Sequence, residues 1–256
     1  MKKFFHILGI VGIAIFSFYY TDKIALLVQE KNPVLQEIKS KQASLEIPFV
    51  NAQIEDNYII PGVSGSVVNV EKSFFNMKAI NAYNESYIVY DEVKPEVSVA
   101  SNKDKIIISG NKSKKQVSII IEDDENLKTY FAKYDVNLLI TKENYAANLG
   151  YELINNESNT KYFKQLNTLI DKDEQNKYLC LYNKDNYEIC KKNQNYIVKN
   201  SLVLNNKSII EVKNNLEAGS IILVTKNAAL SDINLMLREI KFKDLKIVYL
   251  SQLIKE

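Results

Sequence analysis

Short runs of β-branched and aliphatic residues alternate with helical patterns over the second half of the chain. The runs cover residues 106–109, 117–121, 136–140, 179–182, 202–204, 221–224 and 247–250. Between them, apolar spacing predicts helices over residues 126–134, 142–149, 160–171 and 229–241. Strands that are apolar along their whole length and are separated by helices are typical of a parallel sheet buried on both faces. We therefore predict an α/β fold, doubly wound or a barrel, over residues 105–256.

The N-terminus carries the pattern of a membrane anchor. Lys2 and Lys3 precede an apolar run of about 17 residues, which is at the short limit for crossing a bilayer. The end of this run offers no pair of small residues at the −3 and −1 spacing that signal peptidase needs, and Tyr19 and Tyr20 suit the aromatic belt at a membrane surface. We predict an uncleaved, single-pass transmembrane helix over residues 1–21, with the rest of the chain outside the cytoplasm. A cleaved signal peptide is the alternative.

Residues 22–104 are interpreted as a stalk and a mixed membrane-proximal segment. The expected elements are a helical stalk broken at Pro33, a short helix and two short strands, over residues 22–45, 71–82, 87–90 and 97–100. All four prolines precede residue 96, and the strand–helix alternation begins at Lys105. We therefore predict three parts, residues 1–21, 22–104 and 105–256.

Histidine and arginine are almost absent from the chain. The only histidine, His6, lies in the apolar N-terminal run, and the only arginine is Arg238. The rest of the chain therefore cannot build a His-ligated zinc site, a Ser-His triad or a Cys-His dyad. The net charge of +2, with lysines dispersed among acids, argues against nucleic-acid binding. The seven glycines form neither a GxGxxG motif nor a P-loop, which argues against a nucleotide site.

Cys180 and Cys190 are the only cysteines. Outside the cytoplasm they could close a short disulfide loop, worth about 2–3 kcal/mol through the entropy of the unfolded chain. The alternative is a pair of free thiols that pack as small apolar groups. The sequence leaves both states open.

Polar residues follow several of the predicted strands, where sites of parallel-sheet folds lie. The acidic run 122–125 follows one strand, residues 150–156 precede Thr160, and residues 219–225 form a late strand. In order and spacing these segments resemble the motifs of the polysaccharide deacetylase (NodB-homology) family. That family acts on N-acetylated glycans of cell walls. The resemblance covers roughly residues 105–256 and implies a distorted (β/α) barrel.

The resemblance implies roles for five positions. Family enzymes hold a divalent metal such as zinc with one Asp and two His, and a second Asp acts as general base. Glu122 stands at the position of the general base, and Asp123 at that of the metal-binding Asp. Asn156 and Thr160 stand where the two histidine ligands are expected, and Thr225 replaces the histidine that assists as general acid. The chain thus resembles a degenerate member that has lost its metal-binding histidines.

These departures remove the metal-assisted mechanism. Carboxylate, amide and hydroxyl oxygens suit zinc poorly, and without an imidazole near Thr225 the leaving amine lacks its proton donor. We therefore expect no cofactor, and a membrane-anchored, non-catalytic protein of the cell envelope that binds or organises cell-wall glycan.

Two other functions stay open. The first alternative is a diverged deacetylase or hydrolase that acts on N-acetylated glycan through Glu122 and Asp123. The second is a small extracytoplasmic interaction protein whose resemblance to the family is accidental. The acidic run also has a structural interpretation as a solvated loop in which Asp123 or Asp124 caps the following helix.

Overall fold

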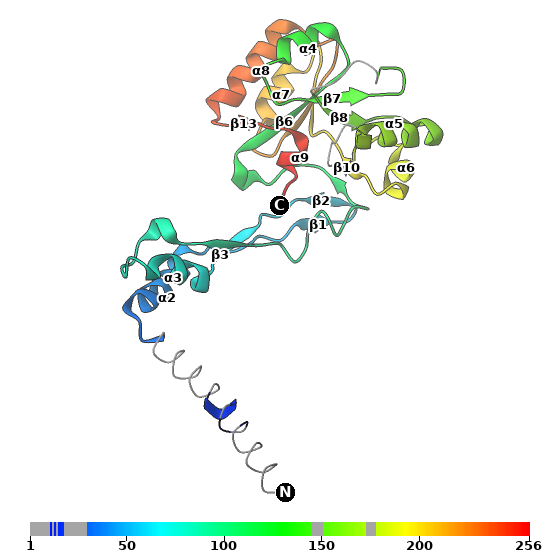
Figure 1. Cartoon of the computed structure of the whole chain (residues 1–256). Coiled ribbons are helices and arrows are strands. Elements are labelled where there is room, and N and C mark those ends of the chain that lie inside the picture. The colour runs from blue at the N-terminus through cyan, green and yellow to red at the C-terminus, as the bar shows by residue number, and fades with distance from the viewer. Residues whose placement is uncertain (1–10, 12, 14, 18–29, 145–150, 173–177) are drawn as a thin grey trace, which may run out of the picture. The chain divides into compact units, whose positions relative to one another are not determined.

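The computed structural model describes residues 11, 13, 15–17, 30–144, 151–172 and 178–256. The chain forms two compact units, Met1–Pro48 with Gly65–Val93, and Phe49–Ser64 with Lys94–Glu256 (Figure 1). Within the described residues no helix has the length and apolar character needed to cross a bilayer. The anchor expected over residues 1–21 lies mostly outside the described residues.

The smaller unit is a pair of helices with a two-stranded antiparallel sheet. Its elements are α2 (Pro33–Leu45), β3 (Gly65–Val68), α3 (Val70–Lys78), a 3-10 helix (Glu85–Tyr87) and β4 (Tyr90–Val93). The helix break expected at Pro33 is confirmed, because α2 begins there and Asn32 caps it by accepting from Val34 N at 2.9 Å. Ile38, Phe74 and Met77 are the centre of a small apolar core.

The larger unit, called the α/β unit below, contains an eleven-stranded sheet. Its strands are β1 (Gln53–Glu55), β2 (Tyr58–Ile60), β5 (Ile106–Ile107), β6 (Gln116–Ile121), β7 (Asn137–Ile140), β8 (Glu152–Asn155), β9 (Leu179–Leu181), β10 (Tyr196–Val198), β11 (Leu202–Leu204), β12 (Ile221–Val224) and β13 (Lys246–Ile247). The order is β1-β2-β5-β10-β9-β8-β7-β6-β12-β11, and β13 also pairs with β6. β1 and β2 pair in antiparallel fashion, and the other described pairs of named strands in this sheet are parallel. The two ends of this order, β1 and β11, do not pair with each other, so the described strands form an open half-barrel, which fits the expected distorted barrel.

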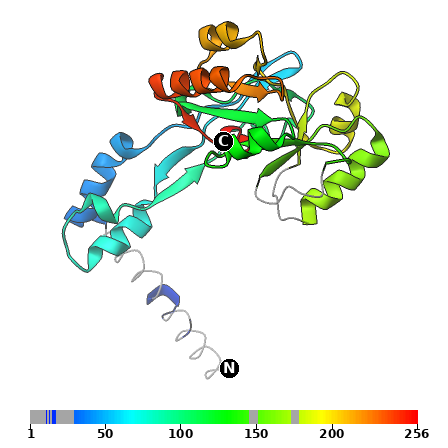
Figure 2. The same ribbon diagram turned by 90° about the horizontal axis from the view of Figure 1, so that it is seen from above.

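Helices cover the sheet. They are α4 (Glu125–Phe131), α5 (Thr160–Lys172), α6 (Tyr187–Lys192), α7 (Ile209–Asn215), α8 (Leu230–Phe242) and α9 (Leu250–Leu253). The helices expected over residues 126–134, 160–171 and 229–241 are confirmed. Of the helix expected over residues 142–149, the first three residues form a turn and the others lie outside the described residues. Figures 1 and 2 show α5 and α8 toward opposite ends of the sheet.

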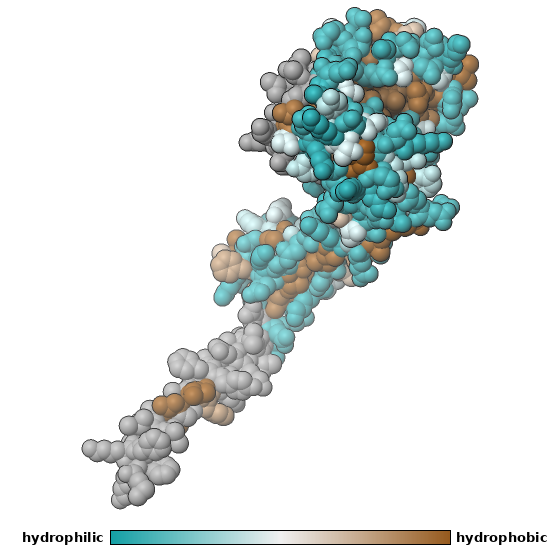
Figure 3. All heavy atoms as spheres, turned by 90° about the vertical axis from the view of Figure 1, so that its right-hand side faces the viewer, coloured by the Kyte–Doolittle hydropathy of each residue, from teal (hydrophilic) through white to brown (hydrophobic). Residues whose placement is uncertain are grey.

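Both faces of the sheet are buried, which explains why its central strands are apolar throughout. Successive side chains of a strand point to opposite faces. Ile119 and Ile121 of β6 therefore pack in the core beneath α4, α5, α7 and α8, whereas Ile120 packs in a second core with α9. Polar side chains cover most of the outer face seen in Figure 3.

Part of the expected membrane-proximal segment belongs to the α/β unit. β2 pairs in parallel with β5, through Tyr58 with Ile106 and Ile59 with Ile107. Residues 49–64 and 94–104 thus lie on the far side of the boundary placed at residue 105. The strand expected over residues 97–100 is instead a loop, in which Val99 N donates to the Glu256 carboxylate at 2.9 Å. Sequence patterns placed the start of the α/β unit at residue 105 because they do not reveal that β2 pairs with β5, which is distant in the chain.

The two cysteines form a disulfide between β9 and α6. Cys180 and Cys190 are joined with their Cα atoms 6.2 Å apart, and both are fully buried. They pack with Ile106, Phe163 and Ile197 in a separate apolar cluster. The structure thus selects the disulfide over the pair of free thiols.

Candidate functional site

The carboxyl ends of β8, β7, β6 and β12 form one edge of the sheet because these parallel strands are neighbours. Asn156 follows β8, Glu122 and Asp123 follow β6, and Thr225 follows β12. Four of the five predicted positions therefore lie along one edge, which we call the carboxyl edge. Thr160 is the exposed first residue of α5, which Asn159 caps. Among the described residues, no hydrogen bond or ion pair joins any two of the five side chains.

Glu122 and Thr225 directly follow the paired strands β6 and β12, but their side chains bind backbone atoms rather than each other. The Glu122 Oε2 atom accepts from Lys226 N at 2.9 Å. The Thr225 hydroxyl donates to Leu204 O at 3.3 Å. Thr225 is therefore a satisfied strand-end hydroxyl, and Glu122 ties the loop after β12 to the end of β6. Neither contact relays a proton between the two side chains.

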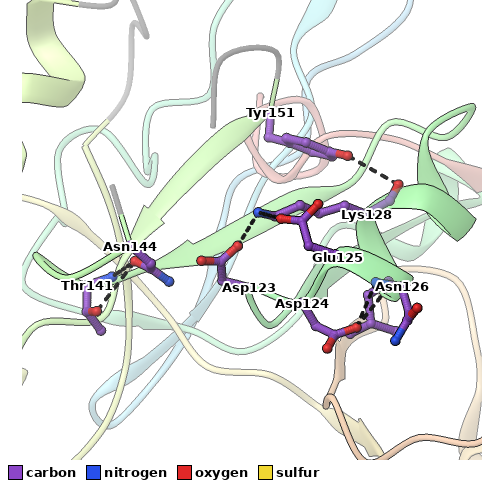
Figure 4. A network of polar contacts seen from close by, with 9 residues as sticks. Asp123, Asp124, Glu125, Asn126, Lys128, Thr141, Asn144 and Tyr151 are labelled. Atoms are coloured by element: carbon purple, nitrogen blue, oxygen red, sulfur yellow. Dashed lines mark hydrogen bonds and ion pairs between the residues drawn. The ribbon is translucent and has the colours of Figure 1, made fainter. Parts of the chain in front are cut away.

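Asp123 forms an ion pair with Lys128 of α4 (Figure 4). The same ammonium lies 2.9 Å from a carboxylate oxygen of Glu125. The side chains of Lys128 and Asp123 are only 12% and 21% exposed, whereas that of Glu125 is 88% exposed. The Asp123–Lys128 pair is thus the sheltered part of this group. Sequence reasoning missed Lys128 as a member of the site.

Local helix capping explains this arrangement. Asp124, rather than Asp123, caps α4 by accepting from Asn126 N at 3.0 Å and Leu127 N at 3.1 Å. The cap leaves Asp123 free to meet the side chain of Lys128, one turn into the helix (Figure 4). One member of the acidic run is therefore structural, as the capping interpretation proposed, and its neighbour forms the ion pair.

The ammonium of Lys128 stays protonated at neutral pH. Burial lowers its pKa, but hydrogen bonds and charge attraction from Asp123 and Glu125 outweigh burial and raise the pKa above the ordinary 10.5. The Lys128 carbonyl also accepts from the Tyr151 hydroxyl at 3.3 Å, which links α4 to the segment before β8 (Figure 4). A fixed positive charge therefore accompanies the Asp123 carboxylate.

Asparagine side chains build the part of the edge around β8. Asn183, in the loop after β9, donates from Nδ2 to Asn156 Oδ1 at 3.4 Å. Asn155, which is buried, donates to Phe163 O at 3.1 Å and to Asn167 Oδ1 at 3.0 Å, so that it fixes α5 against β8. The abundance of asparagine in the sequence is the only advance signal of this network. Which asparagine side chains bond to each other could not be predicted from their spacing in the sequence.

The donor set does not fit the divalent metal that the resemblance implies. Asp123 is paired with an ammonium, the amide oxygen of Asn156 accepts from Asn183, and Thr160 is exposed. Among the residues that the structure describes, no group of three His, Cys, Asp or Glu side chains could hold a metal ion. We therefore derive no catalytic step through a metal.

Comparison with known proteins gives one partial sequence match and a set of similar folds. No protein-family profile matches the sequence. The uncharacterized protein YlxY of Bacillus subtilis (strain 168) is 35% identical over 92 residues, which are 36% of this chain and 29% of that protein. The match thus spans less than a third of that relative.

Solved structures of a CE4 family pseudoenzyme extend over most of the chain. Wild-type BA3943 from Bacillus anthracis superposes with a TM-score of 0.60 and 18% identity, over 87% of this chain and 95% of that one. A BA3943 mutant described as having restored enzymatic activity gives the same TM-score, over 87% and 98% of the two chains. The expected deacetylase-like architecture is confirmed at the level of fold. The chain therefore has the fold of a CE4 family pseudoenzyme.

Proposed function

We propose that this chain is a non-catalytic, deacetylase-like protein of the cell envelope that binds glycan at the carboxyl edge. In this proposal residues 1–21 anchor the chain in the membrane, and the α/β unit lies outside the cytoplasm. The observation that carries the loss of catalysis is the sheltered ion pair of Asp123 with Lys128.

The ion pair opposes a metal through simple electrostatics. A divalent ion bound to Asp123 would lie about 4 Å from the Lys128 ammonium, and the two would repel each other by about 8 kcal/mol at an effective dielectric constant of about 20. The ion would have to displace Lys128 while gaining only amide and hydroxyl oxygens from Asn156 and Thr160 as further ligands. Lys128 instead neutralises the carboxylate from within the chain.

The proposal of glycan binding rests on the chemistry of the edge. Amide and hydroxyl groups of Asn156, Asn183 and Thr141 follow neighbouring strands and are partly exposed. Such groups both donate and accept hydrogen bonds, as sugar hydroxyls and acetamido groups require. The fold shared with a CE4 family pseudoenzyme supports the same class of ligand, in line with the resemblance of residues 105–256 to polysaccharide deacetylases.

The envelope location rests on two features. The disulfide between Cys180 and Cys190 is typical of proteins in oxidising compartments. The apolar run behind Lys2 and Lys3 has the composition of a membrane anchor with its N-terminus in the cytoplasm. Because Cys180 and Cys190 are buried, the test uses a cysteine introduced at an exposed position, Lys207→Cys, and a membrane-impermeant maleimide on intact cells. Labelling that requires permeabilised cells would contradict it.

Glycan binding and catalysis are separated by measuring both on one preparation. We expect the full-length chain in detergent to bind N-acetylglucosamine oligomers in calorimetry and to release no acetate from them. Asn156→Ala with Asn183→Ala should weaken this binding, whereas Asn214→Ala with Asn215→Ala, a matched pair at the end of α7, should not. Acetate release that Asp123→Ala abolishes would contradict the proposal and favour the diverged enzyme.

A further inference from the structure

Two adjoining cavities lie against α8, one beside the end of α4 and the turn that follows it, and the other beside that turn and β13. One has a volume of about 300 Å³ and its lining includes Lys133, Arg238 and Lys241. The other has a volume of about 420 Å³, and its lining includes Ile240, Leu245 and Ile247 together with the carboxylates of Asp135 and Asp244. Both cavities are lined by Tyr134 and Leu237, so they form one surface, which we call the α4–α8 groove.

Helical spacing and one hydrogen bond shape the groove. Asn234, Leu237, Arg238 and Lys241 follow the i, i+3, i+4, i+7 spacing that places residues on one face of a helix, here α8. The Tyr130 hydroxyl of α4 donates to Asn234 Oδ1 and joins the two helices. The ring of Tyr130 also packs edge-on against the buried Phe131, with centroids 5.5 Å apart. The walls are therefore held in place without a ligand.

The first cavity has an uncompensated positive charge. Three cations line it and no carboxylate does. Within the described part of the chain, every salt bridge lies elsewhere, and Lys133, Arg238 and Lys241 belong to none of them. The chain as a whole is nearly neutral, with 33 basic and 31 acidic residues. In the second cavity, Asp244 is paired with Lys115 at 3.4 Å, so Asp135 is the one lining carboxylate outside the salt bridges of the described residues and the groove keeps a net positive charge. Such a concave surface attracts an opposite charge, and Arg238 adds a planar fork that matches a carboxylate.

The second cavity and its surroundings call for an apolar partner as well. Leu237, Ile240 and Leu245 give it an apolar wall. Phe242, at the end of the same helix, is 85% exposed. Arginine and exposed aromatic side chains, here on the same helix, are typical of protein–protein contacts.

We propose that the α4–α8 groove is a docking site for an acidic polypeptide segment that carries a bulky apolar side chain. Acidic side chains of the segment meet Arg238, Lys241 and Lys133, and its apolar side chain enters the second cavity. A polyanionic polymer would satisfy only the cations, so a polypeptide fits the whole groove better. This inference is independent of glycan binding at the carboxyl edge.

Designed peptides test the proposal on the full-length chain. The probe is a short fluorescent peptide in which Glu alternates with Leu and Trp, and the matched probes carry Lys for each Glu, or Ser for each Leu and Trp. We expect the first peptide to bind and the other two to bind at least about tenfold more weakly. Arg238→Glu with Lys241→Glu should reverse the preference between the Glu and Lys peptides. Lys207→Glu with Lys213→Glu, an equal charge change on exposed lysines, should not.

Each other outcome contradicts the proposal. Equal binding of the Glu and Lys peptides, or a preference that Arg238→Glu with Lys241→Glu leaves unchanged, excludes the groove as the acidic-peptide site. Retained binding of the Ser peptide, together with competition by inorganic polyphosphate, identifies a polyanion site instead of a polypeptide partner. Thermal unfolding followed by circular dichroism shows whether both charge-reversal variants keep the fold.

Discussion

The two edges of the same sheet use polar groups in opposite ways. The amino ends of β7 and β8 begin with Asn137 and Glu152 and lie at what we call the amino edge. There, buried Asn137 accepts from Ser118 Oγ at 3.1 Å and from Leu250 N at 2.9 Å, and it donates to Glu152. Glu152 also accepts from Ser251 N at 3.0 Å. At the carboxyl edge, Asn156 and Asp123 each have few partners and partial exposure.

The difference separates a structural network from a candidate site. Asn137 and Glu152 join β7 and β8 to the start of α9, so their hydrogen-bonding capacity is used within the fold. Asn156 keeps donors and acceptors for a ligand. Polar residues at strand ends therefore indicate a site only where the fold leaves their capacity unused.

Removing Asn137 should give the largest effect. Asn137→Ala leaves the Leu250 N–H and one side of the Glu152 carboxylate without a partner in the core, so we expect a loss of about 3 kcal/mol in the free energy of unfolding. Asn156→Ala, its counterpart at the carboxyl edge, should lose less than about 1 kcal/mol. Urea denaturation measures both. Equal losses would break the distinction between the two edges.

The disulfide should give the next largest effect. Cys180→Ala with Cys190→Ala opens a short loop, and we expect a loss of about 2–3 kcal/mol in the free energy of unfolding. Reduction of the unaltered chain should lower the stability by a similar amount, since both treatments remove the same cross-link. A double variant that is as stable as the oxidised chain would show that the cross-link does not form in solution.

Replacing Lys128 should decide whether the carboxyl edge can hold a metal. Asn156→His with Thr160→His restores two imidazoles, but Lys128 still repels an ion at Asp123. Adding Lys128→Met should tighten Co²⁺ binding at least about tenfold, measured by visible absorption. Adding Lys207→Met, an equal charge change on an exposed lysine, should not. If the triple variant binds no metal, positions 156 and 160 do not face Asp123, and the resemblance fails there.

The pH dependence of the ion pair should give the smallest effect. The pKa of Lys128 is higher in the folded chain than the ordinary 10.5, so its contribution to stability is complete below that pH and is lost as pH rises through the folded pKa. Asp123→Asn should therefore lose about 1 kcal/mol at neutral pH, and the gap to the unaltered chain should close in strong alkali. A gap that stays constant with pH would contradict the pairing.

Sequence patterns located most of the strands that are buried on both faces, but they missed the three-residue β10 and the strands with polar ends. β6 and β12 were predicted because nearly every residue is apolar. β8 was missed because Glu152 and Asn155, at its two ends, belong to polar networks. β1 and β2 were missed because their pairing is exposed and joins the sheet only through the distant β5.

For the candidate site, the order of motifs along the chain predicted which residues follow strands, but not which side chains contact each other. The resemblance placed Glu122, Asp123 and Thr225 at one edge because each follows a strand. It could not place Lys128, since its approach to Asp123 depends on Asp124 capping α4. Likewise, the stripe on α8 is visible in helical spacing, but the tyrosines opposite it come from α4 (Tyr130) and from the turn after α4 (Tyr134).

The α/β unit is built from two separate stretches of the chain, residues 49–64 and 94–256, and residues 65–93 between them belong to the smaller unit. A fragment that starts at Lys105 would lack β1 and β2, so that β5 (Ile106–Ile107) would become an unpaired edge strand. Unpaired apolar strands of this kind recruit other chains. N-terminally truncated forms of this protein should therefore aggregate in expression trials unless they retain Phe49 and the residues after it. A smaller form is better made by shortening the insertion, residues 65–93, than by removing β1 and β2.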